Sequence, residues 1–336
     1  MIAGLVELVY LLAAVLFIIG LKWMSSPSRA LRGNLLSSFG MLMAIVVTLF
    51  DQQILSYQLI VYGMLAGSAA GLWMARAVPM TAMPQMVGVL NGFGGGASLM
   101  VAASEWHRLI QPGAVMTMDT AITIYASTLV GGVTFAGSMI AGAKLQEIIP
   151  GRPILFKGQH WLNLTMVLVM VAMGTAMTLQ PDQGTLFIVM NLLALVLGVT
   201  LVIPIGGADM PVIICLLNSY SGIAGALTGF VIKNDGLIIT GALVGASGII
   251  LTQIMCKAMN RSIWNVLFGG FGAVATGPLG DREKALAARG VRQINLEDAA
   301  ALLAYSKQVM IVPGYGLAVA QGQHQVQELA AMLEKR

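Results

Sequence analysis

A glycine turn near the end of the chain carries the residue types that hold a dinucleotide phosphate. Gly314 and Gly316 are followed by a small residue, Ala320, one place later than the usual third glycine. Gly314 allows a tight turn, Gly316 lets a phosphate approach the backbone, and the N-terminus of a following helix faces the negative charge. The apolar run 308–313 predicts a buried strand before the turn, and residues 317–335 predict a helix after it. This order is the opening unit of a dinucleotide-binding fold.

Two asparagines, Asn91 and Asn218, lie in the middle of long apolar runs. If these runs cross a membrane, each amide must find hydrogen-bond partners inside the protein, because lipid offers none. One interpretation is an interhelical bond that only holds the helices together. The other is a polar path between the fourth, eighth and ninth apolar runs, extended by three serines, Ser219, Ser221 and Ser247.

This polar path lacks a titratable group of its own. No Asp, Glu, His, Lys or Arg lies deep in any of the apolar runs. Proton relays through membranes usually depend on such residues. Either another chain supplies the proton-binding group, or there is no proton path.

Three charged residues flank the eighth and ninth runs. Asp209 precedes Met210-Pro211, where it either caps the eighth helix or places a carboxylate at the mouth of the polar path. Lys257 and Arg261 follow the ninth run. One interpretation is that they follow the positive-inside rule and interact favourably with the negative C-terminal end of the helix dipole. The other is that they help a nucleotide-binding domain to dock onto the membrane domain.

The apolar runs that position these residues define the class of protein. Apolar residues make up 57% of the 336 residues and charged residues 10%, against about 25% in soluble domains. Runs of about 20 apolar residues are long enough to cross a hydrocarbon core of about 30 Å. We therefore expect a multi-pass bundle of about nine transmembrane helices, with spans at 2–20, 35–50, 55–74, 82–103, 120–143, 161–179, 185–205, 212–232 and 237–255.

The basic residues predict the orientation of the bundle rather than nucleic-acid binding. The connections after spans one, three, five and nine hold Lys22, Arg29, Arg32, Arg76, Lys144, Arg152, Lys157, Lys257 and Arg261. The opposite connections hold only Arg108 and Lys233. The N-terminus is therefore expected outside and the C-terminal part in the cytoplasm, where a soluble nucleotide would be.

Small residues recur at helical spacing in several spans. Gly222, Gly225 and Gly229 share one face of the eighth span with Asn218, and Gly241, Gly245 and Gly248 share one face of the ninth. Such spacing lets helices approach closely, so most of these glycines are interpreted as packing residues.

The composition changes after the ninth span. We predict a transmembrane domain over 1–260, a linker over 261–295, and the start of a nucleotide-binding domain over 296–336. Residues 296–305 are apolar at helical spacing and follow Asn295, a plausible N-cap. The fold class is thus mainly α, with the first βα unit of a Rossmann-like domain at the end.

Several runs together resemble the beta subunit of the proton-translocating NAD(P) transhydrogenases. They are Met83-Pro84-Gln85, Asn91-Gly92, 206–212 (GGADMPV), 217–222 (LNSYSG), 241–245 (GALVG), 256–262 (CKAMNRS) and 313–321 (PGYGLAVAQ). The resemblance implies an enzyme subunit of an inner membrane that couples hydride transfer between NAD(H) and NADP(H) to proton translocation. It implies an alpha subunit that carries NAD, and a homodimer of alpha–beta units in the bilayer.

The resemblance also implies which residues carry the function. The NADP site would begin at Gly314, Tyr315, Gly316, Leu317, Ala318, Val319, Ala320 and Gln321. The residues expected in the proton path and its coupling are Asn91, Asp209, Asn218, Ser247, Gly248, Lys257 and Arg261. Some members of the family have histidine at the position of Asn91, and others have asparagine there with a histidine on a partner's helix.

Members of the family continue for well over a hundred residues past the position of Arg336. A single βα unit buries too little surface to fold alone, so we expect this chain by itself to bind NADP weakly or not at all and to be inactive. The alternative function is a catalytically incompetent membrane scaffold or a proton-channel fragment.

Overall fold

The computed structural model describes residues 2–49, 57–112, 116–180, 184–259, 261–267, 294–314, 317 and 322–335. All regular secondary structure in these residues is helical. Nine of the helices are long and apolar enough to cross a membrane. They are α1 (Ile2–Met24), α2 (Ala30–Leu49), α3 (Tyr57–Ala77), α4 (Met83–Leu109), α5 (Met118–Leu145), α6 (Gln159–Leu179), α7 (Gly184–Val202), α8 (Met210–Ile232) and α9 (Asp235–Ala258).

All of the predicted spans are confirmed as helices. The second, expected to be short, begins at Ala30 and has 20 residues, enough to cross the hydrocarbon core. Short 3-10 turns, η1 (Met80–Ala82) and η2 (Gly207–Asp209), lead into α4 and α8. Pro84 and Pro211 stand in the first turn of these two helices, where a missing N–H costs nothing.

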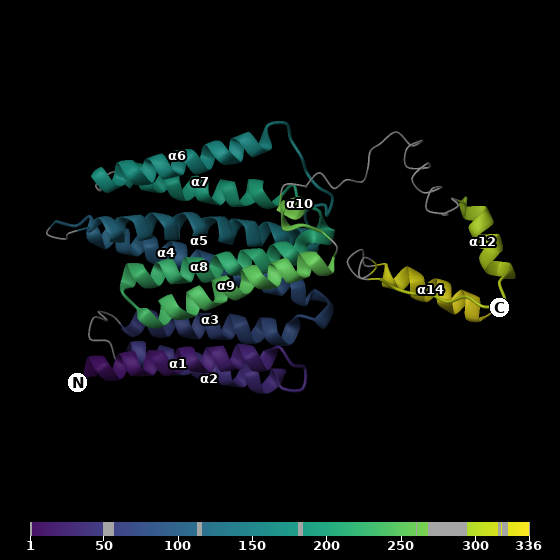
Figure 1. Cartoon of the computed structure of the whole chain (residues 1–336), viewed down its shortest axis with the longest axis horizontal. Coiled ribbons are helices and arrows are strands. Elements are labelled where there is room, and N and C mark those ends of the chain that lie inside the picture. Colours follow the sequence, from purple (N-terminus) through teal and green to yellow (C-terminus); the bar gives the residue numbers. More distant parts are fainter. Residues whose placement is uncertain are drawn as a thin grey trace.

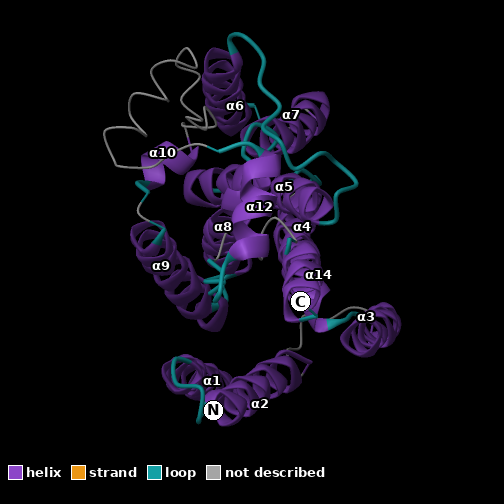
Figure 2. Ribbon diagram, turned by 90° about the vertical axis from the view of Figure 1, so that its right-hand side faces the viewer, coloured by secondary structure: helices purple, strands orange, loops and turns teal. Residues whose placement is uncertain are grey.

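The long helices run alongside one another, and α5 occupies the centre (Figure 1). It packs against α4, α6, α7 and α8. Viewed along the bundle, α1 and α2 form a pair at the margin and α3 stands apart (Figure 2). No described residue of α3 is buried. The N-terminus and the segments that follow α9 lie at opposite ends of the bundle (Figure 1).

Two hydrophobic clusters form the core. One joins α4, α5, α6 and α7 and includes the stacked rings of Trp106 and Phe187, whose centroids are 4.3 Å apart. The other surrounds Met210 and Ile213 at the start of α8 and includes Val266 of the short helix α10 (Ile263–Leu267). The first residues of the predicted linker therefore pack against the membrane bundle.

Glycine allows the closest helix approaches. A Cβ atom at Gly95 would lie 2.8 Å from the carbonyl oxygen of Gly131, and one at Gly222 would lie 2.9 Å from that of Gly241. Neither distance is tolerable, so the α4–α5 and α8–α9 contacts both require glycine. The packing interpretation is confirmed for Gly222 and Gly241.

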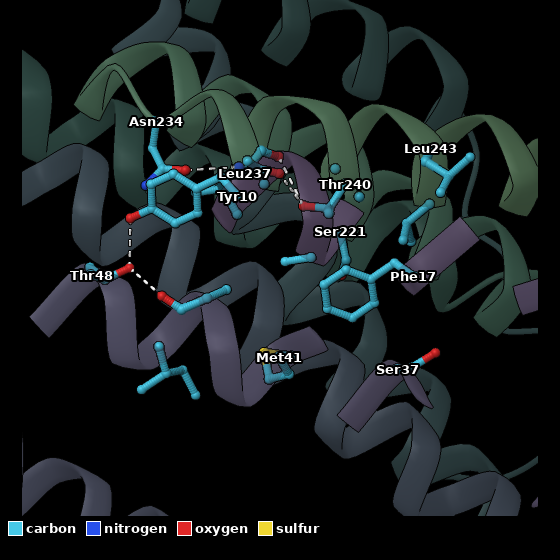
Figure 3. A pocket seen from close by; sticks show the side chains of 18 of the residues that line it. Tyr10, Phe17, Ser37, Met41, Thr48, Ser221, Asn234, Leu237, Thr240 and Leu243 are labelled. Carbon is cyan, nitrogen blue, oxygen red and sulfur yellow. Dashed lines mark hydrogen bonds between the residues drawn. The ribbon is translucent and has the colours of Figure 1, made fainter. Parts of the chain in front are cut away.

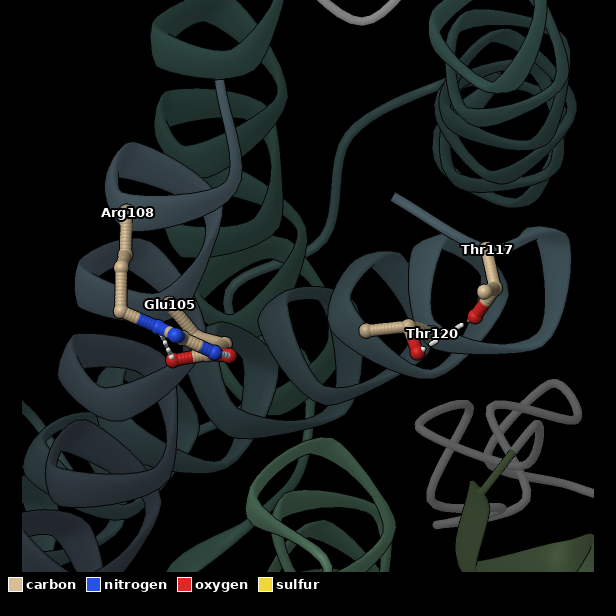
Figure 4. Close-up of polar contacts among 4 residues, drawn as sticks. All are labelled: Glu105, Arg108, Thr117 and Thr120. Atoms are coloured by element: carbon tan, nitrogen blue, oxygen red, sulfur yellow. Dashed lines mark hydrogen bonds and ion pairs between the residues drawn. The ribbon is translucent and has the colours of Figure 1, made fainter. Parts of the chain in front are cut away.

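Polar contacts mark the ends of α4 and α5 that lie on the N-terminal side of the bundle (Figure 4). Arg108 pairs with Glu105 in the last turn of α4. Thr117 and Thr120 share a hydroxyl hydrogen bond of 2.8 Å in the first turn of α5. Both contacts are exposed, so they contribute little to stability.

The C-terminal part differs from the prediction. The helix over 296–305 is confirmed as α12 (Leu296–Tyr305), and the Asn295 side chain accepts a hydrogen bond from the Asp298 N–H. The described residues 306–314 are neither helix nor strand, so the strand predicted over 308–313 is not formed. A strand needs a hydrogen-bonded neighbour, and the described residues provide none. Of the helix predicted over 317–335, Leu317 is helical but Gly322 is a turn, and the described helix α14 begins only at Gln323 (Gln323–Glu334).

Candidate functional site

Asn91 is the centre of a buried polar joint between three helices. Its side-chain amide on α4 donates to the Oγ of Ser138 on α5 at 2.8 Å. Its Oδ1 accepts from the Oγ of Ser221 on α8 at 2.8 Å, and its backbone carbonyl lies 3.2 Å from the same hydroxyl. Asn91 is 9% exposed, so these bonds replace those that water would make.

The sequence builds this joint by placing small residues next to Asn91. A Cβ atom at Gly92 would lie 3.3 Å from the Cβ of Ser138. Gly94 faces Ser221 at 3.8 Å, measured from a Cβ atom built on the glycine. Because these glycines carry no side chain, α5 and α8 come within hydrogen-bond distance of the amide. The joint is polar and neutral, and it can orient a proton carrier but contains no titratable carrier itself.

The structure brings together only part of the predicted polar path. Asn91 and Ser221 meet as expected, with Ser138 as a third member that the sequence did not suggest. Asn218 and Ser247 are exposed on the outside of the bundle instead. The Ser247 hydroxyl bonds within its own helix, to the Val244 carbonyl at 3.1 Å. Their faces point away from the α4 contact, so a role for both in a polar path between α4, α8 and α9 stays a prediction.

Ser219 and Gly248 form a separate contact between α8 and α9. The Ser219 hydroxyl donates to the Gly245 carbonyl at 2.5 Å. A Cβ atom at Gly248 would lie 2.8 Å from the Cβ of Ser219. Gly248 therefore lies in a packing contact between the two helices.

Asp209 and Arg261 form an ion pair where the bundle ends. Arg261 Nη1 lies 2.5 Å from Oδ1 and 2.6 Å from Oδ2 of Asp209. Asp209 is 8% exposed, and the Arg261 side chain 32%. Asp209 occupies the N-cap position of α8 but makes no capping hydrogen bond. The capping interpretation is thus wrong, because the carboxylate faces the guanidinium of the segment that follows α9.

Lys257 stands apart from this pair. It is exposed in the last turn of α9, where a cation is favoured by the helix C-terminus. The ion pair lies beside a shallow pocket of about 370 Å³ lined by Gln253, Cys256, Lys257, Arg261, Ser262 and Ile263.

A buried lysine is the functional candidate that sequence reasoning missed. The sequence predicts Lys144 in a connection, but it lies in the last turn of α5 and is 2% exposed. Its Nζ contacts three backbone carbonyl oxygens. The signal was a single cation between apolar neighbours, Ala143 and Leu145, at the end of a span.

A largely apolar cavity of about 830 Å³ lies between the α1–α2 pair and helices α3, α8 and α9. Figure 3 shows the side chains that line it, among them Ser221 of the polar joint. On the far side, Tyr10 and Thr48 share a hydrogen bond of 2.8 Å. Ser221 is therefore reachable both from Asn91 and from this cavity.

The residues predicted to contact NADP are mostly outside the described part. Tyr315, Gly316, Ala318, Val319, Ala320 and Gln321 are not described. A Cβ atom at Gly314 would meet nothing within 4 Å. Without a neighbouring strand, the described residues of the motif do not form a cradle for a nucleotide. No group of three or more His, Cys, Asp or Glu able to hold a metal ion occurs among the residues that the structure describes.

Comparisons with known proteins agree over nearly the whole chain. The family model described as NAD(P) transhydrogenase beta subunit matches residues 6–336. Two relatives from Rhodospirillum rubrum, each named NAD(P) transhydrogenase subunit beta, are 42% identical over 339 aligned positions. The alignment covers 97% of this chain and 70% of each relative. With its nine apolar helices and its polar joint inside the bundle, this chain belongs to the NAD(P) transhydrogenase beta subunit family.

Proposed function

We propose that this beta subunit links proton translocation to hydride transfer between NAD(H) and NADP(H) through the Asp209–Arg261 ion pair. This pair is the observation that carries the proposal. Asp209 is joined directly to α8, and Arg261 lies on the segment that connects α9 to α10 and continues toward the C-terminal part. A movement of α8 that makes or breaks the pair therefore changes the position of the Arg261 segment, and a movement of that segment changes the position of α8.

The Asn91 joint supports the membrane half of the proposal. Ser221 follows Asp209 by 12 residues along α8, which is about 18 Å at 1.5 Å per residue. One rigid helix thus connects the ion pair with the buried amide. A shift or rotation of α8 changes both the ion pair and the Asn91–Ser221 bond.

The alpha subunit is the partner proposed to supply NAD and the proton-binding group. Among the described residues, the joint contains hydroxyl and amide groups but no carboxylate or imidazole. Asn218 is exposed within a span, where lipid would leave its amide without partners. Both observations support a partner helix beside α8. The homodimer of alpha–beta units stays a proposal from the family resemblance.

NADP binding is proposed for the motif 314–321 only when further strands complete the sheet around it. The described residues of the motif do not form the cradle of the nucleotide. When bound, the nicotinamide supplies or accepts the hydride. The scaffold alternative is not favoured, because the family match extends from the first span through the glycine motif.

The proposed location is an inner membrane, with the N-terminus outside. The C-terminal segments and the Asp209–Arg261 pair then lie on the cytoplasmic side. The basic residues of the connections on that side support this orientation.

The test is to reconstitute this chain with its alpha subunit in vesicles, with a segment that completes the NADP domain added in trans. We expect NADPH-driven reduction of an NAD analogue and a simultaneous signal from a pH-sensitive dye. The same vesicles without the added segment are the control and should show neither. Failure of hydride transfer in the completed system would remove the enzymatic role of this chain.

A further inference from the structure

Lys144 is the only buried lysine or arginine among the residues that the structure describes. Its Nζ lies 2.5 Å from the carbonyl oxygen of Ile203, 2.8 Å from that of Ile205 and 3.3 Å from that of Arg152. A lysine ammonium has three N–H donors, and here three acceptors meet it. All three acceptors are backbone atoms, so the cation holds the backbone of these segments in place and does not pair with a carboxylate.

The three carbonyls belong to two connections at the same end of the bundle. Arg152 lies between α5 and α6, whereas Ile203 and Ile205 lie between α7 and α8. Backbone bonds join the same two connections: the Gly207 N–H donates to the Gly151 carbonyl at 2.7 Å, and the Ile154 N–H donates to that of Ile203 at 3.3 Å. Lys144 is thus the side-chain part of a clamp that fixes the two connections to the end of α5.

A cation suits this place for a second reason. Helix α7 ends at Val202, and its C-terminal carbonyls carry partial negative charge. The Lys144 ammonium bonds to the carbonyl of the next residue, Ile203. An apolar side chain at position 144 would leave the three carbonyls, of which that of Ile205 is buried, with fewer donors and this helix end without a compensating charge.

The clamped connection ends at Asp209. Gly206 follows Ile205, and the turn η2 (Gly207–Asp209) comes next. Its last residue, Asp209, carries the carboxylate that pairs with Arg261. We propose that Lys144 is a positioning residue that holds the α7–α8 connection still, so that Asp209 stays in place while the Arg261 segment moves. This inference rests on the proposed role of the ion pair in coupling. With Asp209 fixed, displacement of the Arg261 segment breaks the pair instead of drawing the connection along.

The functional test uses the complete alpha–beta complex in vesicles and measures the rate of hydride transfer and the number of protons moved per hydride. Lys144→Met removes the donors, Lys144→Arg keeps a cation with donors, and Lys157→Met, at an exposed lysine of the α5–α6 connection, is the matched control. We expect Lys144→Met to lower the coupled rate by about tenfold, with partial rescue in Lys144→Arg and no change in the control.

A double-mutant cycle with Asp209→Asn separates positioning from general damage. If Lys144 acts through Asp209, adding Lys144→Met to Asp209→Asn causes little further loss of coupled rate. Independent structural damage would multiply the two losses instead, which overturns the inference.

Amide hydrogen exchange provides a second readout that needs no activity. In Lys144→Met, the amides of Ile203 and of residues 205–209 should exchange at least about tenfold faster than in the wild type, while those of α9 remain unchanged. If the Met variant does not accumulate in the membrane, Lys144→Gln, which keeps one shorter donor group, is measured in its place. Wild-type exchange over 203–209 in the folded variant contradicts the clamp.

The outcomes also separate this inference from the proposed function. A wild-type complex that transfers hydride without moving protons overturns both. A coupled wild type whose Lys144→Met variant keeps the wild-type rate and proton-to-hydride ratio overturns the role of Lys144 alone.

Discussion

At the scale of single residues, the bundle contains a small number of buried polar groups whose bonds can be followed atom by atom. Asn91 is bonded at both ends of its amide, to Ser138 and Ser221. An interhelical hydrogen bond in a membrane protein contributes only about 0.6 kcal/mol on average. Leaving a buried donor or acceptor without a hydrogen-bond partner costs more, about 1–3 kcal/mol. The stability lost on substitution of Asn91 is therefore set mainly by the groups left without a partner.

We therefore expect Asn91→Leu to destabilise the membrane domain by about 1–3 kcal/mol, because the Ser138 hydroxyl loses its donor and the Ser221 hydroxyl keeps only the backbone carbonyl of residue 91 as an acceptor. It should also lower the number of protons moved per hydride transferred. Thermal unfolding in detergent and the vesicle assay check the two effects.

Asn191→Leu is the matched control for this prediction. Asn191 also lies in a span, but its amide bonds to the Phe187 carbonyl of its own helix at 2.7 Å. Equal losses of coupling in both variants would mean that the joint has no special role.

At the scale of helices, the α8–α9 pair depends on backbone contact. The face that carries Gly222 on α8 meets Gly241 and Gly245 on α9, and Ser219 reaches a carbonyl of the partner helix. Lipid is as apolar as the helix surface, so close packing and such bonds hold the pair together.

We expect Gly222→Ala to separate α8 from α9 and to lower the thermal stability of the bundle by about 1–3 kcal/mol, because the added methyl meets backbone atoms that cannot move aside. The midpoint of thermal aggregation in detergent measures this. Gly225→Ala, on the same helix, is the control, because its Cβ would meet only the Leu237 Cδ1 at 4.0 Å. A Gly222→Ala protein as stable as this control would contradict the packing argument.

At the scale of the whole molecule, the orientation in the membrane decides which cofactor the C-terminal part can meet. The nine long apolar helices of the described residues leave the N-terminus and the segment after α9 at opposite ends of the bundle. Basic residues favour the cytoplasmic side for the latter.

The orientation predicts the labelling of two cysteine variants in a background in which Cys215 and Cys256 are replaced. Lys22→Cys should react with a membrane-impermeant maleimide only from the cytoplasmic side, and Arg108→Cys only from outside. Labelling intact spheroplasts and inverted vesicles gives the comparison. The reverse pattern would place the Asp209–Arg261 pair on the wrong side for a soluble nucleotide.

Sequence alone determined the features that depend on local composition. The nine spans follow from hydropathy, because an apolar run of about 20 residues has few alternatives to a membrane helix. The N-cap of α12 follows from Asn295, whose side chain reaches the N–H three residues later. The family follows from long runs of matching residues.

Tertiary structure alone decided which residues meet. The sequence marked Asn91 as a polar residue in a span, but only packing brings Ser138 to it from 47 positions away. Asn218 shares a helix with Ser221 yet faces outward, because the position of a neighbouring helix, and not the spacing, selects the buried face. Lys144 looked like a loop cation because its three partners are backbone carbonyls of distant connections, and backbone atoms leave no pattern in a sequence.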